Sequence, residues 1–127
     1  VKIEESEAMM FDGMEGLVFG IHVDHGEGRL VFPDESIRER SVQKKMIPMV
    51  YVDDNREATE KYPFNPNGSA DGMAALCSED GRHLALMPHP ERAFLPWQAH
   101  YLPRNMEAFP VSPWMKMFQN AYNWCMK

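Results

Sequence analysis

The chain has 127 residues, enough for a single domain, and its 44% apolar and 25% charged residues are typical of a globular protein in water. Its net charge of −6 argues against nucleic acid or an anionic membrane as a partner. No apolar run approaches the ~20 residues of a membrane span, no signal peptide opens the sequence, and two cysteines do not make a disulfide framework. We therefore expect a cytoplasmic protein with reduced thiols.

The first half of the chain predicts short strands around one helix. Apolar and polar residues alternate over 1–4 and 17–23, the period of a half-buried strand. Asp34 is a suitable N-cap for a helix over 35–45. Further strands are expected over 30–32, 46–52 and 58–62. Because the first strand has no turn or cap before it, we expect the chain to be the C-terminal part of a longer domain.

The second half predicts a loop, a hairpin and a final helix. Residues 64–72 are rich in Pro, Asn and Gly and form the loop. Strands over 73–78 and 82–87 flank the turn 79–81. Ser112 and Pro113 are typical of the first positions of a helix. Apolar residues then recur at helical spacing to the end of the chain, at Trp114, Phe118, Ala121, Tyr122 and Cys125.

The candidate chemistry lies just after the hairpin, where His89 stands between two prolines. Pro90 biases His89 toward an extended conformation, in which Glu91 would point to the same side. A carboxylate beside an imidazole fixes its tautomer and stabilises its protonated form, as a general base requires. The alternative is a solvated loop in which both side chains meet only water.

The motif Pro88-His89-Pro90-Glu91-Arg92 resembles the His-x-Glu end of the Cys-His-Glu triad in class I glutamine amidotransferases. Further blocks narrow the resemblance to the C-terminal part of the glutaminase domain in formylglycinamide ribonucleotide amidotransferases, which are glutamine-dependent ligases of purine biosynthesis. These blocks are Gly13-Met14-Glu15-Gly16, His25-Gly26-Glu27-Gly28-Arg29, Tyr51-Val52-Asp53-Asp54, the run 62–69 and Ser112-Pro113-Trp114-Met115. Their order and spacing extend the resemblance over essentially the whole chain.

This resemblance implies an α/β fold, the C-terminal portion of a flavodoxin-like class I domain that is rich in antiparallel strands and ends in an α-helix. It implies that residues 1–127 are that portion, with the nucleophilic cysteine upstream. His89 would be the acid/base and Glu91 its orienting carboxylate. The reaction would release ammonia from glutamine for an ATP-dependent synthesis. We expect no cofactor in this chain, with ATP and Mg in a synthetase domain elsewhere in the same polypeptide, and glutamine and that polypeptide as partners.

A second candidate site is the run that begins with His25, Gly26 and Glu27. Its glycines allow a ligand to approach the backbone closely, and the resemblance supports a loop that contacts the α-amino and α-carboxylate groups of glutamine. An exposed β-turn is the alternative. For the stretch Asn65 to Ser69, a structural turn is the preferred interpretation.

Neither cysteine has the Gly-rich turn that exposes a nucleophile. Cys77 lies in a strand and Cys125 in the last helix, so we expect the chain alone to be inert. A metal site is not expected, because the histidines lack the spacing of metal ligands. A non-catalytic relative that lacks the full triad and serves binding or regulation is the alternative to the enzyme.

Overall fold

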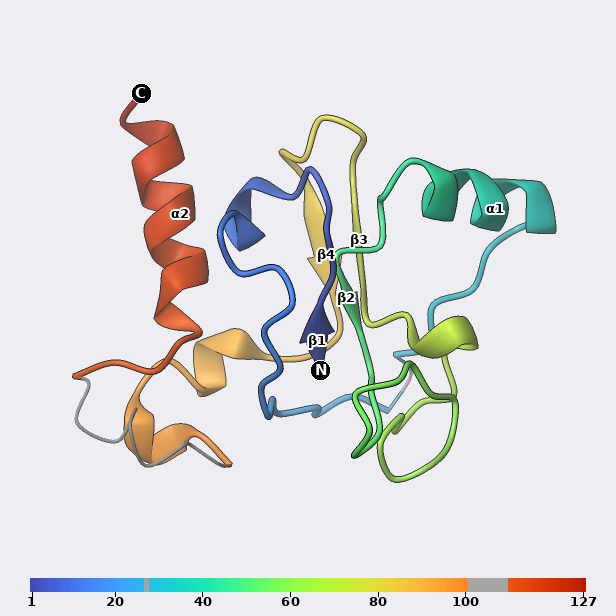
Figure 1. Cartoon of the computed structure of the whole chain (residues 1–127), viewed down its shortest axis with the longest axis horizontal. Coiled ribbons are helices and arrows are strands. Elements are labelled where there is room, and N and C mark those ends of the chain that lie inside the picture. The colour runs from blue at the N-terminus through green and yellow to red at the C-terminus, as the bar shows by residue number, and fades with distance from the viewer. Residues whose placement is uncertain (27, 101–109) are drawn as a thin grey trace.

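A computed structural model describes residues 1–26, 28–100 and 110–127 of the chain. Four short strands lie at its centre (Figure 1), namely β1 (Lys2–Ile3), β2 (Met49–Val50), β3 (Ala75–Cys77) and β4 (Leu84–Leu86). The pairs β1–β2 and β3–β4 are antiparallel, and a bridge between Val50 and Met73 joins them. The strands predicted over 1–4, 46–52, 73–78 and 82–87 are thus present in shortened form.

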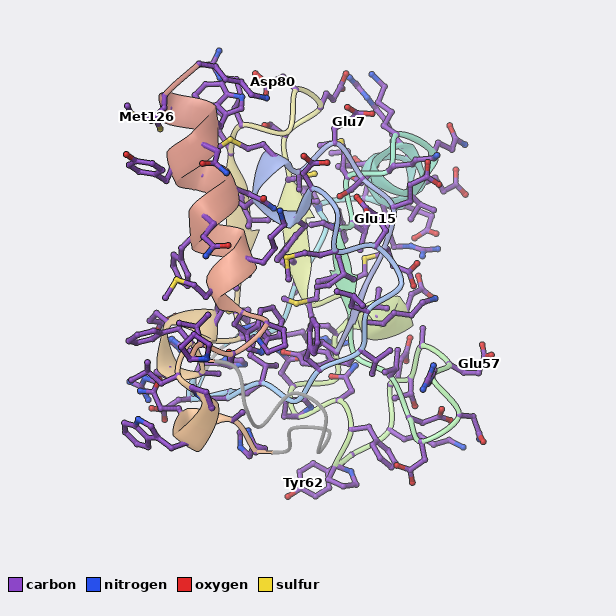
Figure 2. All side chains as sticks on the ribbon, turned by 60° about the vertical axis from the view of Figure 1, so that its left-hand side comes forward. Glu7, Glu15, Glu57, Tyr62, Asp80 and Met126 are labelled. Atoms are coloured by element: carbon purple, nitrogen blue, oxygen red, sulfur yellow. The ribbon has the colours of Figure 1, made fainter. Side chains whose placement is uncertain are left out.

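The turn between β3 and β4 packs on the N-terminal segment. Gly81 adopts a φ of +67°, and a Cβ there would lie 1.6 Å from the backbone oxygen of Glu7. Met9 donates a backbone hydrogen bond to Gly81 at 3.1 Å. Figure 2 shows the Asp80 turn and Met126 at one end of the molecule and Tyr62 at the other. Only glycine fits this turn, which fixes the direction in which β4 leads into the candidate site.

Two α-helices lie on opposite sides of the strands (Figure 1). The first, α1 (Glu35–Gln43), has the predicted cap, because the amide of Ile37 donates to Oδ1 of Asp34 at 3.1 Å. The second, α2 (Met115–Cys125), begins later than predicted. Ser112 is not its N-cap: its hydroxyl accepts a bond from the amide of Trp114 at 3.2 Å, in a turn that precedes the helix.

The buried face of α2 differs from the predicted apolar stripe. Met117 and Asn120 are buried, whereas Tyr122 is 65% exposed and Cys125 is also exposed. The amide of Asn120 donates to the carbonyls of Met10 (3.0 Å) and Asp12 (2.8 Å). The 3₁₀ helix η1 (Met9–Phe11) contains the first of these carbonyls, so a polar side chain helps to fix α2 against it, beside the buried Met117.

Trp114 is the largest fully buried side chain and joins the core to the loops. Its ring meets Phe19 edge-on with 5.4 Å between centroids, a favourable aromatic geometry. Its indole N–H donates to the carbonyl of Gly20 at 3.0 Å. Around it pack Ile3, Phe11, Met14, Met49, Ala75 and Met117. The core therefore reaches from the strands to the segment that precedes His22.

The strands predicted over 17–23, 30–32 and 58–62 do not form as continuous strands, and within them the structure has isolated bridges at Val18 and Ala58. Beside the first bridge, backbone hydrogen bonds join Leu17 to Ile3 and Phe19 to Val1, so the first residues of 17–23 do pair with the N-terminal strand. The carbonyl of Gly20 accepts from an indole and that of His22 from the amide of His89. The first bond ties this segment to the core and the second ties it to the candidate site, so neither carbonyl takes part in a strand ladder. The coarse fold class is confirmed: a small α/β arrangement of antiparallel strands with a C-terminal helix.

Candidate active site

His89 follows β4 and directly precedes the 3₁₀ helix η3 (Pro90–Arg92). Its φ of −113° and ψ of 81° lie outside the α region, in keeping with the proline that follows. The chain does not stay extended through Glu91, because η3 turns it. The turn nonetheless brings the two side chains together, with Nδ1 of His89 2.6 Å from Oε1 of Glu91.

This contact defines the chemistry of the histidine. An ionised carboxylate only accepts hydrogen bonds, so Nδ1 of His89 carries the proton and Nε2 of the neutral ring has a free lone pair. Burial is the largest single influence and raises the pKa of Glu91. The hydrogen bond from His89, a backbone hydrogen bond and the charges of His89 and Arg92 together outweigh burial, so the pKa lies below its ordinary value. An ionised Glu91 stabilises the imidazolium. The pair can therefore take up a proton at Nε2 and return it.

Residues 22–26 lie beside the His89 segment. The backbone amide of His89 donates to the carbonyl of His22 at 2.8 Å. The guanidinium of Arg92 forms an ion pair with the carboxylate of Asp24. These contacts join chain segments that are more than sixty residues apart. The structure thus brings the predicted substrate-side loop next to the predicted acid/base.

Within that loop, His25 and Gly28 are in close contact. A Cβ at Gly28 would lie 1.9 Å from Cδ2 of the His25 ring, so this position requires glycine. Gly26 is exposed, and a Cβ there would have no neighbour within 4 Å. Glu27, the third residue predicted for this site, lies outside the described residues.

A polar side chain that the sequence did not assign to the site anchors this loop. Nδ2 of Asn67 lies 2.7 Å from the carbonyl oxygen of Gly28 and 3.1 Å from Nε2 of His25. The hydroxyl of Ser69 accepts from the amide of Leu30 at 3.1 Å. The composition of 64–72 predicted a turn, and turn bonds are present, such as that from the Ser69 amide to Oδ1 of Asn67. Composition gives no signal for the contacts to residues 25–30.

His22 and His100 are adjacent, a contact that the sequence does not predict. Their ring centroids are 4.0 Å apart, and Nε2 of His22 lies 2.9 Å from the carbonyl oxygen of Gln98. That carbonyl belongs to the 3₁₀ helix η4 (Pro96–Gln98). Burial, and to a lesser degree the neighbouring His22, lowers the pKa of His100. The pair packs η4 against the segment whose carbonyl holds His89.

The cysteines lie apart from His89. Cys77 pairs with Leu84 at the hairpin end of β4, while His89 follows the other end. Burial raises the pKa of the Cys77 thiol, which favours the unreactive protonated form. Cys125 is the last residue of α2, and Figure 1 places that end of the helix far from η3. Each cysteine is therefore poorly placed to transfer its proton to His89.

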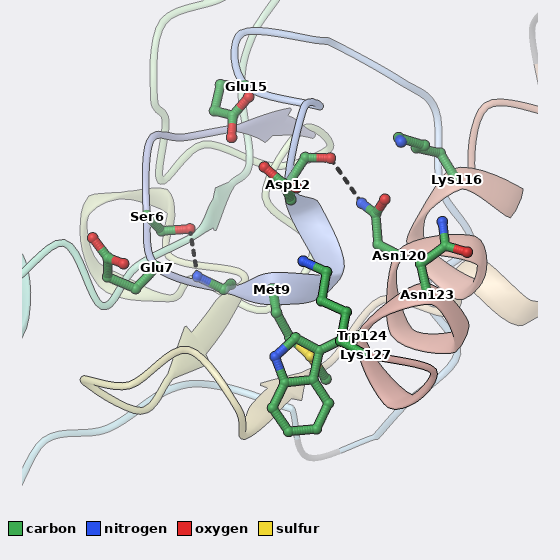
Figure 3. Close-up of a pocket in the computed structure, with 11 residues that line it drawn as sticks. Ser6, Glu7, Met9, Asp12, Glu15, Lys116, Asn120, Asn123, Trp124 and Lys127 are labelled. Carbon is green, nitrogen blue, oxygen red and sulfur yellow. Dashed lines mark hydrogen bonds between the residues drawn. The ribbon is translucent and has the colours of Figure 1, made fainter.

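Across residues 1–26, 28–100 and 110–127, no three or more His, Cys, Asp or Glu side chains are grouped so as to hold a metal ion. No helix in this part of the chain has the length and apolar character needed to cross a membrane. A polar cavity of about 390 Å³ lies between α2 and the segment 6–15 (Figure 3), lined by Asp12, Asn120 and Trp124 among others. None of its lining residues belongs to the candidate site.

Comparison with known proteins defines the class. Residues 1–125 match the model of the CobB/CobQ-like glutamine amidotransferase domain, and the chain belongs to this family. The His89–Glu91 pair therefore lies in a chain of an amidotransferase family.

The named relatives narrow this result. The chain is 51% identical over 126 residues to "Probable phosphoribosylformylglycinamidine synthase, chloroplastic/mitochondrial" of Arabidopsis thaliana, covering 98% of this chain and 9% of the relative. It is 50% identical to phosphoribosylformylglycinamidine synthase of Drosophila melanogaster and 42% identical to that of Homo sapiens, covering 100% of this chain and 10% of each relative. The resemblance seen in the sequence is confirmed. The chain spans about a tenth of the length of these relatives.

Proposed function

We propose that this chain is part of a glutaminase that releases ammonia from glutamine. The observation that carries the proposal is the His89–Glu91 pair, with 2.6 Å between Nδ1 and Oε1, held beside the loop 22–28 in a chain of the amidotransferase family. A cysteine thiolate attacks the side-chain amide of glutamine, and ammonia leaves with the help of a proton from Nε2 of His89. Water activated by the same nitrogen then hydrolyses the glutamyl thioester.

The nucleophile in this proposal comes from residues outside this chain. Cys77 is buried in β3, opposite the hairpin end of β4, and Cys125 lies in the last turn of α2. The chain would then be the C-terminal part of a flavodoxin-like class I domain, and His25, Gly26 and Glu27 would form a loop that contacts the amino-acid end of glutamine.

The names of the relatives suggest the use of the ammonia. We propose that the chain acts within a longer cytoplasmic polypeptide that converts formylglycinamide ribonucleotide to formylglycinamidine ribonucleotide. ATP and Mg would bind in the synthetase domain of that polypeptide, and no cofactor would bind in this chain. Glutamine and the rest of the polypeptide would be its partners.

The test is His89→Ala in the whole polypeptide, assayed with glutamine and separately with ammonium. General acid–base groups contribute about 10²–10⁴-fold in rate, and glutamine-dependent synthesis should fall by that factor. Ammonium-dependent synthesis should persist, because it bypasses His89. His83→Ala, which removes an exposed histidine of the hairpin, is the control. A parallel fall of both activities in folded protein would contradict the proposal.

The positions of Cys77 and Cys125 also fit a second function, a triad-deficient module for binding or regulation. Both functions predict that the chain alone releases no ammonia from glutamine. Turnover by the chain alone that disappears in Cys77→Ala or Cys125→Ala would contradict both. An undiminished glutamine-dependent rate in His89→Ala would favour the binding module.

A further inference from the structure

The orientation of the Asn67 side chain is fixed by its neighbours. Its Oδ1 faces the amide of Ser69 at 3.0 Å and the hydroxyl of Ser69 at 2.8 Å. Its Nδ2 faces the carbonyl oxygen of Gly28 at 2.7 Å. An amide N–H can only donate and a carbonyl can only accept. A flipped amide would place donor against donor and acceptor against acceptor, so the two ends cannot be exchanged.

This orientation determines the state of His25. The second hydrogen on Nδ2 of Asn67 points to Nε2 of His25, 3.1 Å away. If Nε2 accepts that hydrogen bond, the ring proton is on Nδ1, which is buried and has no hydrogen-bond partner among the described residues. Asn67 thereby uses both hydrogens of its amide on the loop, one on the Gly28 carbonyl and one on the His25 ring.

The anchor of Asn67 is itself rigid. Ser69 is fully buried, and its hydroxyl also accepts from the amide of Leu30 at 3.1 Å. Asn65, 2% exposed, donates to the carbonyls of Thr59 and Ser69 at 2.9 Å each. Buried amides bonded in this way hold a loop in one conformation. The loop that begins with His25 therefore rests on a buried polar network and not on apolar packing.

We propose that Asn67 is a positioning residue for glutamine binding, which holds the neutral His25 ring and the Gly28 carbonyl in place through the two hydrogens of its amide. The inference rests on the proposed glutaminase function and adds a residue to it. Pre-forming the loop removes an ordering cost that glutamine would otherwise have to offset. The role concerns affinity, so it acts on KM for glutamine and leaves the ammonium-dependent reaction unchanged.

The test compares Asn67→Asp with Asn67→Ala in the whole polypeptide. Asparagine-to-aspartate keeps the acceptor for Ser69, which is all that the turn requires, and removes both hydrogens directed at the loop. Each variant loses the two hydrogen bonds to the loop, which should raise KM for glutamine about 30-fold, and Asn67→Ala also loses the two that Oδ1 accepts from Ser69. In Asn67→Asp the carboxylate also faces the Gly28 carbonyl, so its defect should equal or exceed that of alanine. Asn55→Ala and Asn55→Asp, at an exposed asparagine outside the network, are the matched controls.

A wild-type KM in Asn67→Asp would overturn the inference, because it would show that only the turn matters. A fall confined to kcat would also overturn it. Ammonium-dependent synthesis in the same samples reports on folding. If Asn67→Asp does not fold, Ser69→Ala decides: it removes two hydrogen bonds of the Ser69 hydroxyl, the one from the Leu30 amide and the one to Oδ1 of Asn67. Their loss should raise KM for glutamine about 30-fold, and an unchanged KM would refute the inference.

These outcomes are separable from the test of the proposed function. An undiminished glutamine-dependent rate in His89→Ala would remove the glutaminase proposal whatever the Asn67 variants show. A large loss in His89→Ala together with a normal KM in Asn67→Asp would remove only the role of Asn67.

Discussion

The two segments of the candidate site are held in different ways. Residues 88–92 are restricted mainly by groups within the segment itself. Pro88 and Pro90 restrict φ, and the amide of Arg92 donates to the carbonyl of His89 at 3.1 Å. The described residues of 25–30 show no such local constraint. Their anchors are Asn67 and Ser69, thirty-nine residues or more along the chain.

This difference teaches where each segment is vulnerable. In the His89 segment several covalent and backbone constraints overlap, so removing one leaves the rest. In the loop 25–30 a single amide carries the bonds to both His25 and Gly28. We therefore expect substitutions in the first segment to act on the chemistry with little effect on binding. Substitutions in the second should act on binding first.

The largest effect that sharpens this comparison is expected for Glu91→Gln. The variant keeps the shape of the side chain and loses the charge that stabilises the imidazolium of His89. We expect kcat with glutamine to fall about 10²-fold, at the lower end of the contribution of general acid–base groups. KM for glutamine should change little, because the backbone constraints remain.

Glu57→Gln, at an exposed glutamate of another loop, is the control for that measurement. A rise in KM as large as the fall in kcat would show that the charge of Glu91 also orders the substrate loop, and the two segments would then not be separable.

How far the sequence predicts this molecule follows the same division. Local patterns found the Asp34 cap of α1, the hairpin turn at Gly81 and the constrained histidine at His89, because capping, turns and prolines act over a few residues. The strand predicted over 17–23 pairs with the N-terminal strand only as far as Phe19, and the next carbonyl, that of Gly20, bonds to Trp114, 94 residues away. Alternation of apolar residues cannot reveal that partner.

The candidate site was predictable to a similar extent. His89 and Glu91 do meet as predicted, but through the turn of η3 and not through the extended chain that their spacing suggested. The bonds from Asn67 to His25 span 42 residues, and a run of Asn, Pro and Gly indicates only a turn. Asn120, which the sequence places on a helix, is likewise buried, and its side-chain amide donates to two carbonyls that are distant in the sequence. Buried polar groups choose partners that only the fold brings near.

A second, smaller effect is expected for Gly28→Ala. The added Cβ would overlap the His25 ring, so the ring must leave its bond with Asn67. We expect KM for glutamine to rise about 10-fold, from one net hydrogen bond and the displaced ring. Val31→Ala, at an exposed side chain just after the loop, is the control. Equal KM values for both variants would show that the ring position does not matter.

The ion pair between Arg92 and Asp24 joins the two segments, and Asp24→Asn tests how much it contributes. Both side chains are more than half exposed, and exposed pairs contribute little, so kcat/KM for glutamine should fall about 5-fold at most. The difference from wild type should shrink with added salt, which screens exposed charges. The control is Arg40→Gln, which removes a comparable exposed ion pair between Arg40 of α1 and Glu79 of the β3–β4 turn. A loss above that bound, persisting in high salt, would mean that the segments depend on this pair.

The smallest effect is expected for Pro90→Ala, which tests whether the first segment is held redundantly. Alanine can adopt the same φ, and the bonds from Arg92 to His89, from Ala93 to Pro90 and from His89 to His22 involve backbone groups that survive the change. What is lost is the restriction that proline places on alternative conformations and part of the packing of a buried ring, so kcat with glutamine should fall only about 2- to 3-fold. Pro96→Ala in η4, outside the His89 segment, is the control. A fall as large as that of Glu91→Gln would show that the ring of Pro90, and not the backbone bonds, keeps His89 facing Glu91.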